Sequence, residues 1–343
     1  MTTRTMLRAL TLMGGLLALG GAARAQGGSL VMYCGVNEQW CRAAATAFQG
    51  QTGIRVDMTR QSAGEIYARL RAERNNPRGD VWFGDTGDPH LQAASEELTE
   101  SYRSESLGQL QDWARNQAER SGHRTVGLYM GALGYGYNET ELKRRGIAAP
   151  GCWADLLRPE FKGEVQVANP NASGTSWTML ATLVQLMGED GAFDYMKRLD
   201  ANVDQYTSIG AAPAQATARG ETMVGIAFQH DVIDAAKQNP NVKVVSPCEG
   251  TGYEIGSMSI VRGARHPEEA RRFYEWALTP AAQAIAASHG SFQLPSNKAT
   301  PIPPEAPDLG SITLINYDFE KYGSAAERGR LLSRWTREIK NAR

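Results

Sequence analysis

Apolar and polar positions change period several times along the chain, most clearly within residues 165–187. Residues 165–168 form a mainly apolar run that predicts a buried strand, and apolar residues at helical spacing predict a helix over 178–187. Four small residues precede that helix: Ser173, Gly174, Thr175 and Ser176. Free N–H groups and the helix dipole make such a start a candidate anion site. The alternative is that these residues only cap their own helix and bind no ligand.

A second strand and helix repeat this arrangement near the N-terminus. Residues 54–58 predict a strand and residues 66–73 predict a helix, with Ser62 at the cap and Glu65 three residues later. This spacing is a capping box, in which the two side chains satisfy each other's backbone N–H groups. If both helix starts face one cleft, they can hold a small anionic or polyhydroxylated ligand from two sides.

The remaining pattern alternates strands and helices, which is typical of α/β units with right-handed crossovers and parallel sheets. Further strands are predicted over 30–33, 80–83, 223–228 and 242–245, and further helices over 40–48, 192–200, 211–219, 270–278 and 281–288. With 343 residues and 42% hydrophobic residues, the chain is long enough for two lobes that each bury a core.

Two long strands with regularly placed glycines, at 126–138 and 253–261, divide the chain. We interpret them as two crossings between lobes, so that one lobe is inserted into the other and the two strands form a hinge. The expected boundaries are 26–132 and 256–343 for the first lobe and 133–255 for the inserted lobe. The tail at 317–340 is expected to be helical and to pack on the first lobe.

A turn rich in Gly and Asp follows the strand at 80–83. In open α/β sheets, ligands bind beyond the carboxyl ends of the strands, so Asp85, Thr86 and Asp88 are candidate ligand contacts, with Gly87 supplying a backbone donor. The alternative is that this turn only reverses the chain.

Residues 1–25 resemble a signal peptide. Arg4 and Arg8 precede an apolar run at 9–19, and Ala23 and Ala25 supply the small residues that a signal peptidase requires. The run is too short to span a bilayer. We expect a soluble periplasmic chain that begins near residue 26. Loss of the three leader arginines changes the formal charge from −1 to −4, which argues against nucleic acid as a partner.

Four cysteines in an oxidising compartment predict two disulfides. Of the three possible pairings, a short bridge from Cys34 to Cys41 is the most economical, and it leaves Cys152 to pair with Cys248. Metal ligation is the competing interpretation, but no C-x-x-C motif or neighbouring His supports it.

Four segments carry a family resemblance: FGDTGDPHLQ at 83–92, GYGYN at 134–138, NPNASGT at 169–175 and FQHD at 228–231. With them the mature chain resembles type II periplasmic solute-binding proteins of ABC importers, in the iron-binding-like branch. That branch includes binders of hexose phosphates, phosphoglycerate and 2-aminoethylphosphonate. The resemblance is strongest to the hexose-phosphate binders, and it implies ligand contacts at Ser62, His230, Asp231 and Glu254.

The chain departs from its apparent relatives at two places. Ferric-ion binders of this branch place two adjacent tyrosines in the second lobe, whereas here Tyr206 stands alone as a candidate ligand contact. The resemblance also implies Gly-Gly-Thr-Gly-Asp-Pro in the first-lobe turn, where this chain has Asp85 as the second residue. A carboxylate near a phosphate is repulsive unless it faces away or meets an amine of the ligand.

The resemblance implies a phosphorylated ligand, and the candidate residues fit one. Hydroxyl and N–H donors at Ser62, Thr86 and 173–176 suit a phosphate without any Arg or Lys, while His230, Asp231 and Glu254 suit sugar hydroxyls. The alternative interpretations are that His230 is an ordinary buried histidine of the core and that Glu254 forms an ion pair in the hinge. We therefore expect a monomeric binding protein without cofactor or metal that closes on a sugar phosphate and delivers it to a permease. Alternatives are 2-aminoethylphosphonate, ferric ion or, distantly, phosphoester hydrolysis by Ser173, His230 and Asp231.

Overall fold

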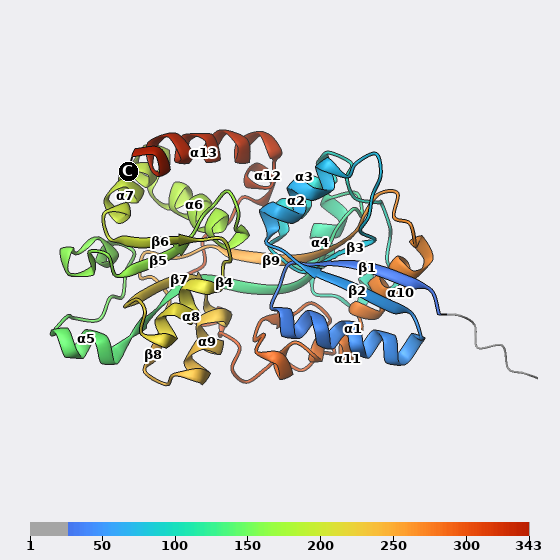
Figure 1. Ribbon diagram of the computed structural model, residues 1–343, viewed down its shortest axis with the longest axis horizontal. Helices are drawn as coiled ribbons and strands as arrows, with labels where there is room; N and C mark the ends of the chain where they lie inside the picture. The colour runs from blue at the N-terminus through green and yellow to red at the C-terminus, as the bar shows by residue number, and fades with distance from the viewer. Residues whose placement is uncertain (1–26, 343) are drawn as a thin grey trace, which may run out of the picture.

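The computed structural model describes residues 27–342, so the predicted signal peptide lies outside the described residues. No helix in that range is long and apolar enough to span a membrane. One mixed sheet of ten strands runs the length of the molecule with helices on both faces (Figure 1). Its main path has the order β2-β1-β3-β9-β4-β7-β5-β6.

The sheet is parallel towards its two ends and antiparallel in the middle. β1 (Ser29–Cys34) pairs in parallel with β2 (Arg55–Arg60) and β3 (Val81–Phe83). At the other end, β5 (Val165–Ala168) pairs in parallel with β6 (Val203–Thr207) and β7 (Val224–Phe228). β8 (Val242–Val245) and β10 (Leu294–Pro295) pair with β4. The carboxyl ends of the parallel strands therefore face each other near the centre of the molecule (Figure 1).

The two central strands are the predicted crossings. β4 (Val126–Asn138) and β9 (Tyr253–Ile260) are antiparallel partners from Val126↔Met258 to Ala132↔Tyr253. Each side of this pair has its own hydrophobic core. One core is built mainly from residues 30–129 and 258–278, and the other from 130–255 and 317–339. The predicted α/β class with two lobes that share the strand pair β4 and β9 is confirmed, and we call the two halves the first lobe and the inserted lobe.

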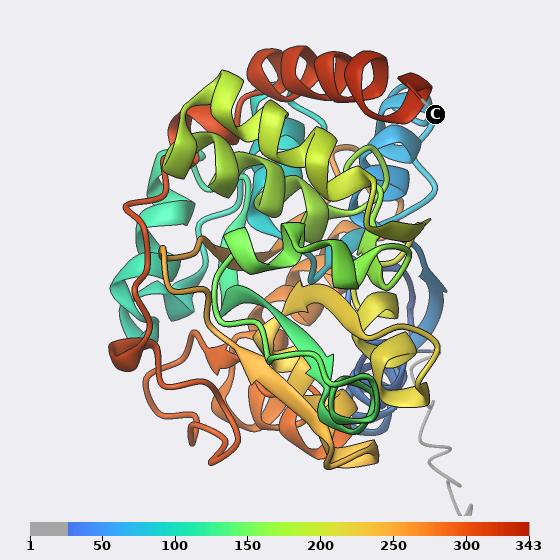
Figure 2. The ribbon, with the colours of Figure 1, turned by 90° about the vertical axis from the view of Figure 1, so that its left-hand side faces the viewer.

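The C-terminal helices pack on the inserted lobe, so the prediction that they pack on the first lobe is wrong. α12 (Phe319–Tyr322) and α13 (Ala325–Glu338) lie over α6 (Gly174–Met187) and α7 (Glu189–Asp200), as Figure 2 shows. Trp335 of α13 is buried in the inserted-lobe core, and Arg330 and Arg334 pair with Glu189. The sequence period shows that α13 has an apolar face, but it carries no information on which lobe that face covers.

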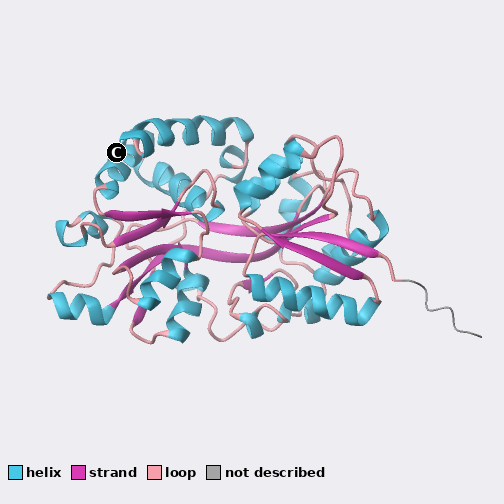
Figure 3. Ribbon diagram, viewed as in Figure 1, coloured by secondary structure: helices cyan, strands magenta, loops and turns pink. Residues whose placement is uncertain are grey.

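The other helices cover the faces of the sheet (Figure 3). They are α1 (Glu38–Thr52), α2 (Ala63–Ala72), α3 (Gly87–Ser95), α4 (Asp112–Arg120), α5 (Glu139–Arg145), α8 (Ala212–Arg219), α9 (Gln229–Gln238), α10 (Pro267–Ala277) and α11 (Pro280–Ala284). Helices α4 and α5 are short and mostly polar, which is why the hydrophobic period did not reveal them. Helix α6 begins four residues before the predicted helix, directly at the small hydroxyl residues.

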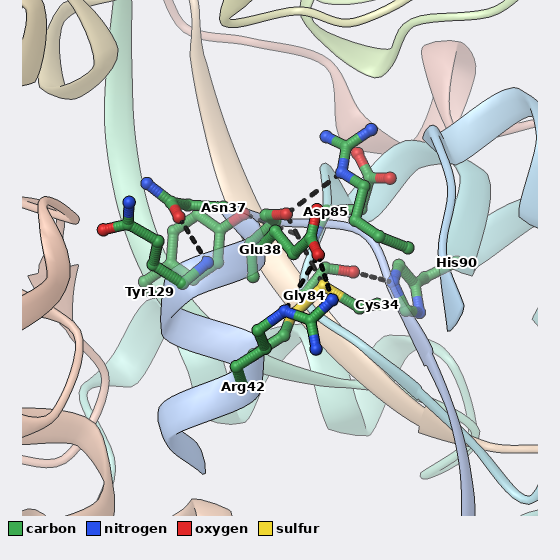
Figure 4. The surroundings of a disulfide bond; sticks show 12 residues. Cys34, Asn37, Glu38, Arg42, Gly84, Asp85, His90 and Tyr129 are labelled. Carbon is green, nitrogen blue, oxygen red and sulfur yellow. Dashed lines mark hydrogen bonds and ion pairs between the residues drawn. A yellow bond between two sulfur atoms is a disulfide. The ribbon is translucent and has the colours of Figure 1, made fainter. Parts of the chain in front are cut away.

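Both predicted disulfides are present. Cys34 at the end of β1 joins Cys41 in the first turns of α1, and Cys152 joins Cys248 across a sequence separation of 96 residues. The first disulfide lies beside the turn that follows β3 (Figure 4). There, a ring nitrogen of His90 contacts the Gly84 carbonyl at 3.0 Å. The Asp85 N–H donates to the Tyr129 hydroxyl at 3.2 Å, so this turn is anchored from two sides.

Candidate functional site

Six helices begin at one cavity between the lobes. Their N-cap residues are Asn37 of α1, Ser62 of α2, Thr86 of α3, Ser173 of α6, Ala211 of α8 and Phe228 of α9, and each lines the cavity. The cavity holds about 500 Å³ of space not filled by atoms, including open solvent at its mouth. Each helix start carries unpaired N–H groups and a partial positive charge. The convergence of six starts therefore favours a bound anion.

The two candidate anion sites, at the helix starts near Ser62 and Ser173, meet in this cavity. Ser62 donates its hydroxyl and its N–H to Glu65 Oε2, at 2.8 and 2.9 Å, which is the predicted capping box. In the first turn of α2, the Gly64 N–H donates to the Ala172 carbonyl across the lobe interface at 2.9 Å. The starts of α2 and α6 thus touch, although they come from different lobes.

Glycine is required where the helix starts of the two lobes approach each other most closely. A Cβ atom built on Gly174 would overlap the Thr86 hydroxyl and would lie 3.0 Å from the Thr86 Cβ. A Cβ atom on Gly64 would lie 2.5 Å from the Asn171 carbonyl oxygen. The missing Cβ atoms therefore let the starts of α2, α3 and α6 approach one another across the lobe interface.

The opposite wall carries a histidine and two acids. His230 Nε2 lies 3.7 Å from Asp231 Oδ1 and 3.8 Å from Glu254 Oε1. Burial lowers the pKa of His230 to about 3, so the ring is neutral at physiological pH. Burial, followed by the nearby Asp234, raises the pKa of Asp231 to about 7. Burial and the neighbouring acids, Asp231 first, raise the pKa of Glu254 well above its usual value.

This mixture of neutral and ionisable groups can both donate and accept hydrogen bonds. A protonated acid offers one O–H donor, and a neutral imidazole offers one donor and one acceptor. The Phe228 ring stacks on His230 with centroids 5.5 Å apart and fixes its orientation. Such a wall suits a ligand with several hydroxyl groups.

The raised pKa of Asp231 gives a testable pH dependence. The folded state binds this proton more tightly than the unfolded chain, so Asp231 lowers stability as pH rises from about 4 through 7. We expect Asp231→Asn to stabilise the unliganded protein by about 1–2 kcal/mol more at pH 8 than at pH 5.5, since one pKa unit is worth about 1.4 kcal/mol. Urea denaturation at both pH values measures this difference. The exposed Asp204→Asn is the control, and equal effects of Asp231→Asn at the two pH values would contradict the assignment.

Several polar atoms at the cavity are buried without a partner among the described residues. They are Asp85 Oδ2, Thr86 Oγ1, Ser173 Oγ, His230 Nδ1 and Gln293 Oε1. Buried polar groups in native proteins are normally hydrogen-bonded to protein or water. A polar ligand in the cavity would satisfy these atoms together.

The structure brings together most of the predicted contacts. Ser62, Thr86, Ser173, Gly174, Thr175, His230, Asp231 and Glu254 line the cavity. Four others do not: Gly87, Asp88, Ser176 and Tyr206. Asp88 accepts from the Tyr317 hydroxyl at 2.8 Å, and Tyr206 donates to Asp200 at 2.7 Å and packs edge-on against Trp335. Gly87 and Ser176 lie inside the first turns of their helices, one or more residues past the cap.

Sequence reasoning missed other residues of the cavity wall. Arg60 lines it and adds a cationic side chain to the candidate donors predicted from the sequence, which include no Arg or Lys. Its place at the end of β2, two residues before a predicted cap, is a signal that could have revealed it. Asn37 similarly follows a predicted strand and caps α1. Tyr129, Ser291 and Gln293 come from a crossing strand and a long loop, where no local pattern indicates a site.

Comparison with known proteins agrees with this architecture. The family model described as bacterial extracellular solute-binding protein matches residues 87–321. The periplasmic binding protein AfuA from Actinobacillus pleuropneumoniae, solved with exogenous fructose 6-phosphate bound, has a TM-score of 0.89 and 43% identity. That match covers 91% of this chain and 99% of AfuA.

Two curated relatives match over most of their length. A Haemophilus influenzae protein described as uncharacterized is 42% identical over 329 residues, 95% of each chain. A candidate 2-aminoethylphosphonate-binding periplasmic protein from Salmonella typhimurium is 30% identical over 259 residues, 72% of this chain and 71% of that protein. The resemblance inferred from the sequence is therefore confirmed. The chain belongs to the bacterial extracellular solute-binding proteins.

Proposed function

We propose that this protein captures a sugar phosphate, most simply a hexose phosphate, and delivers it to the permease of an ABC importer. One observation carries the proposal: six helix starts surround one cavity, and the unpartnered hydroxyl groups of Thr86 and Ser173 lie among them. Donors that are already in place bind a phosphate without the cost of ordering them. Arg60 adds a positive charge to the same wall.

The sugar moiety has its own partners in the proposal. His230, Asp231 and Glu254 can exchange hydrogen bonds with hydroxyl groups of the ring, and the burial of His230 and Glu254 strengthens the bonds that these two make. AfuA, which was solved with fructose 6-phosphate, supports this ligand class by its similarity.

Hinge closure accounts for capture. Ser62 and Thr86 belong to the first lobe, whereas Ser173 and Thr175 belong to the inserted lobe, so a ligand contacts all of them only when the lobes meet. Binding then shifts the population towards the closed form. That form presents to the permease a surface that the open form lacks.

Neither ferric ion nor hydrolysis fits the geometry as well. The acids and His230 of the cavity do not bring three ligand atoms within 4.8 Å of one another, as judged over the residues that the structure describes. Tyr206 lies outside the cavity wall. Ser173 Oγ has no hydrogen-bond partner in the described part of the chain, so it is not joined to His230 as an activated nucleophile would be.

Calorimetry and thermal denaturation with a ligand panel test the proposal. We expect a hexose phosphate at 100 times its Kd to add about 2.7 kcal/mol of apparent stability, and glucose or ferric citrate to add none. Failure of every phosphorylated sugar would contradict the proposal. Release of inorganic phosphate from a bound ester would favour the hydrolase alternative.

A pair of neighbouring serines provides a matched test of the site. Ser173→Ala removes a hydroxyl that lines the cavity, and we expect about tenfold weaker binding of the hexose phosphate. Ser176→Ala removes a buried hydroxyl of the same helix that does not line it, so affinity should stay unchanged. Equal effects of the two substitutions, measured by calorimetry, would place the phosphate elsewhere.

A further inference from the structure

Asp85 occupies a backbone conformation that normally favours glycine. Its φ is +89°, and it follows Gly84, whose φ is +74°. A left-handed conformation is unfavourable for an L-residue because its Cβ crowds the following carbonyl oxygen. The turn is also tightly packed, because a Cβ atom built on Gly35 would lie 2.5 Å from the Asp85 Cβ. A residue kept at this position despite its strain indicates a function for the side chain.

The carboxylate of Asp85 is held at the cavity with half of its hydrogen-bonding capacity unused. Oδ1 accepts the Thr86 N–H at 3.0 Å, while Oδ2 is buried and has no partner among residues 27–342. Asp85 is only 9% exposed, and it lines the cavity. An isolated buried carboxylate is costly unless a donor or a cation meets it.

Burial raises the pKa of Asp85 to about 7, and it outweighs Arg60 and the buried Arg328, which are close enough to lower that pKa. Arg60 is the cationic side chain of the cavity wall, and its Nε donates to the Val36 carbonyl at 3.3 Å. No Lys, Arg or His nitrogen of the described residues lies within ion-pair distance of Asp85. Asp231 and Glu254 line the same cavity, so three acids surround a site that we assign to a phosphate.

We propose that Asp85 selects a phosphorylated ligand that also carries a protonated primary amine, and that the amine donates a hydrogen bond to Oδ2. This inference rests on the proposed function, because it places the amine next to the phosphate that the proposal assigns to the helix start at Thr86. A hydroxyl group could donate to the same oxygen, but only a protonated amine also compensates the charge of the ionised carboxylate. The ligand class is therefore zwitterionic: an amino sugar phosphate or an aminoalkylphosphonate.

Two matched ligand pairs test the inference by isothermal titration calorimetry. The first pair is glucosamine 6-phosphate and glucose 6-phosphate, and the second is 2-aminoethylphosphonate and ethylphosphonate. For the pair whose carbon skeleton fits the cavity, we expect the wild-type protein to bind the amine at least tenfold more tightly. In Asp85→Gly the preference should disappear, and the partner without the amine should bind more tightly than it does to the wild type.

Asp85→Asn separates charge from shape, since it keeps the side chain but removes the negative charge. It should lose most of the amine preference. Asp85→Gly relieves a strained position, so its melting temperature should equal or exceed that of the wild type, which confirms folding. Glu97→Gly is the matched control, because Glu97 also has a positive φ of 56° but is exposed and lies outside the cavity. Its amine preference should equal that of the wild type.

The results distinguish this inference from the proposed function. If sugar phosphates bind but the amine preference is absent, or survives in Asp85→Gly, the role of Asp85 is wrong and the sugar phosphate proposal stands. If only the phosphonates bind, the hexose phosphate proposal fails. The inference about Asp85 then stands or falls on whether 2-aminoethylphosphonate binds more tightly than ethylphosphonate. If none of the four ligands binds, both proposals fail.

Discussion

Gly174→Ala is expected to weaken binding of the phosphorylated ligand by about 1000-fold, or about 4 kcal/mol, while leaving the fold intact. The added Cβ would overlap the Thr86 hydroxyl across the lobe interface and occupy space where N–H groups face the cavity. Closure would then be blocked and the anion seat filled by a methyl group. Alanine is a good residue in the first turn of a helix, so the open protein should be as stable as the wild type.

Calorimetry measures the affinity, and thermal denaturation without ligand measures stability. Gly191→Ala is the control: it makes the same change in a helix of the inserted lobe, where the nearest atom to an added Cβ is a Met187 carbon at 3.4 Å. Full affinity of the Gly174→Ala protein would show that closure does not bring Gly174 and Thr86 together around the ligand. A normal melting temperature of the Gly174→Ala protein without ligand would show that its weaker binding does not come from loss of folding.

Trp335→Ala is expected to destabilise the protein by about 3–5 kcal/mol, as is typical of a large aromatic residue removed from a core. Trp335 is 1% exposed and packs edge-on against Tyr206, with ring centroids 5.3 Å apart. Because α13 covers the inserted lobe, the loss should fall on that lobe. Hydrogen exchange should therefore accelerate in α6 and α7 and stay unchanged in α1 and α10.

Denaturant titration gives the total effect, and Ser333→Ala on the exposed face of the same helix is the control. That change should alter stability by less than about 0.5 kcal/mol. Faster exchange in α1 and α10 instead would mean that the C-terminal helix supports the first lobe, as the sequence alone suggested.

Local sequence patterns predicted the helix starts well because the relevant interactions lie within a few residues. The capping box of Ser62 and Glu65 is one such signal, and the Ser173 start is another. The same holds for the crossing strand Val126–Asn138, whose bounds match the predicted range. The helix starts at Ser62 and Ser173 depend mainly on residues close by in the sequence, so a single sequence is enough to reveal them.

The missed features depend on contacts between distant segments. Gln293 reaches the cavity from a loop without secondary structure, and no period marks it. Asp88 follows a predicted site turn, yet Tyr317, far along the chain, holds its carboxylate away from the cavity wall. The helical pattern of α13 shows that one face is apolar but leaves its partner open. Such outcomes are decided by how lobes dock, which one sequence read in isolation does not specify.

The course of the C-terminal segment bears on how the molecule moves. Between β10 and Tyr317 the chain passes from the first lobe to the inserted lobe, so it spans the interface once more, apart from β4 and β9. Two connecting strands that lie side by side allow the halves to twist as well as to bend. A third connection set apart from them resists the twist, so in the proposed closure the two lobes would approach each other along a single path.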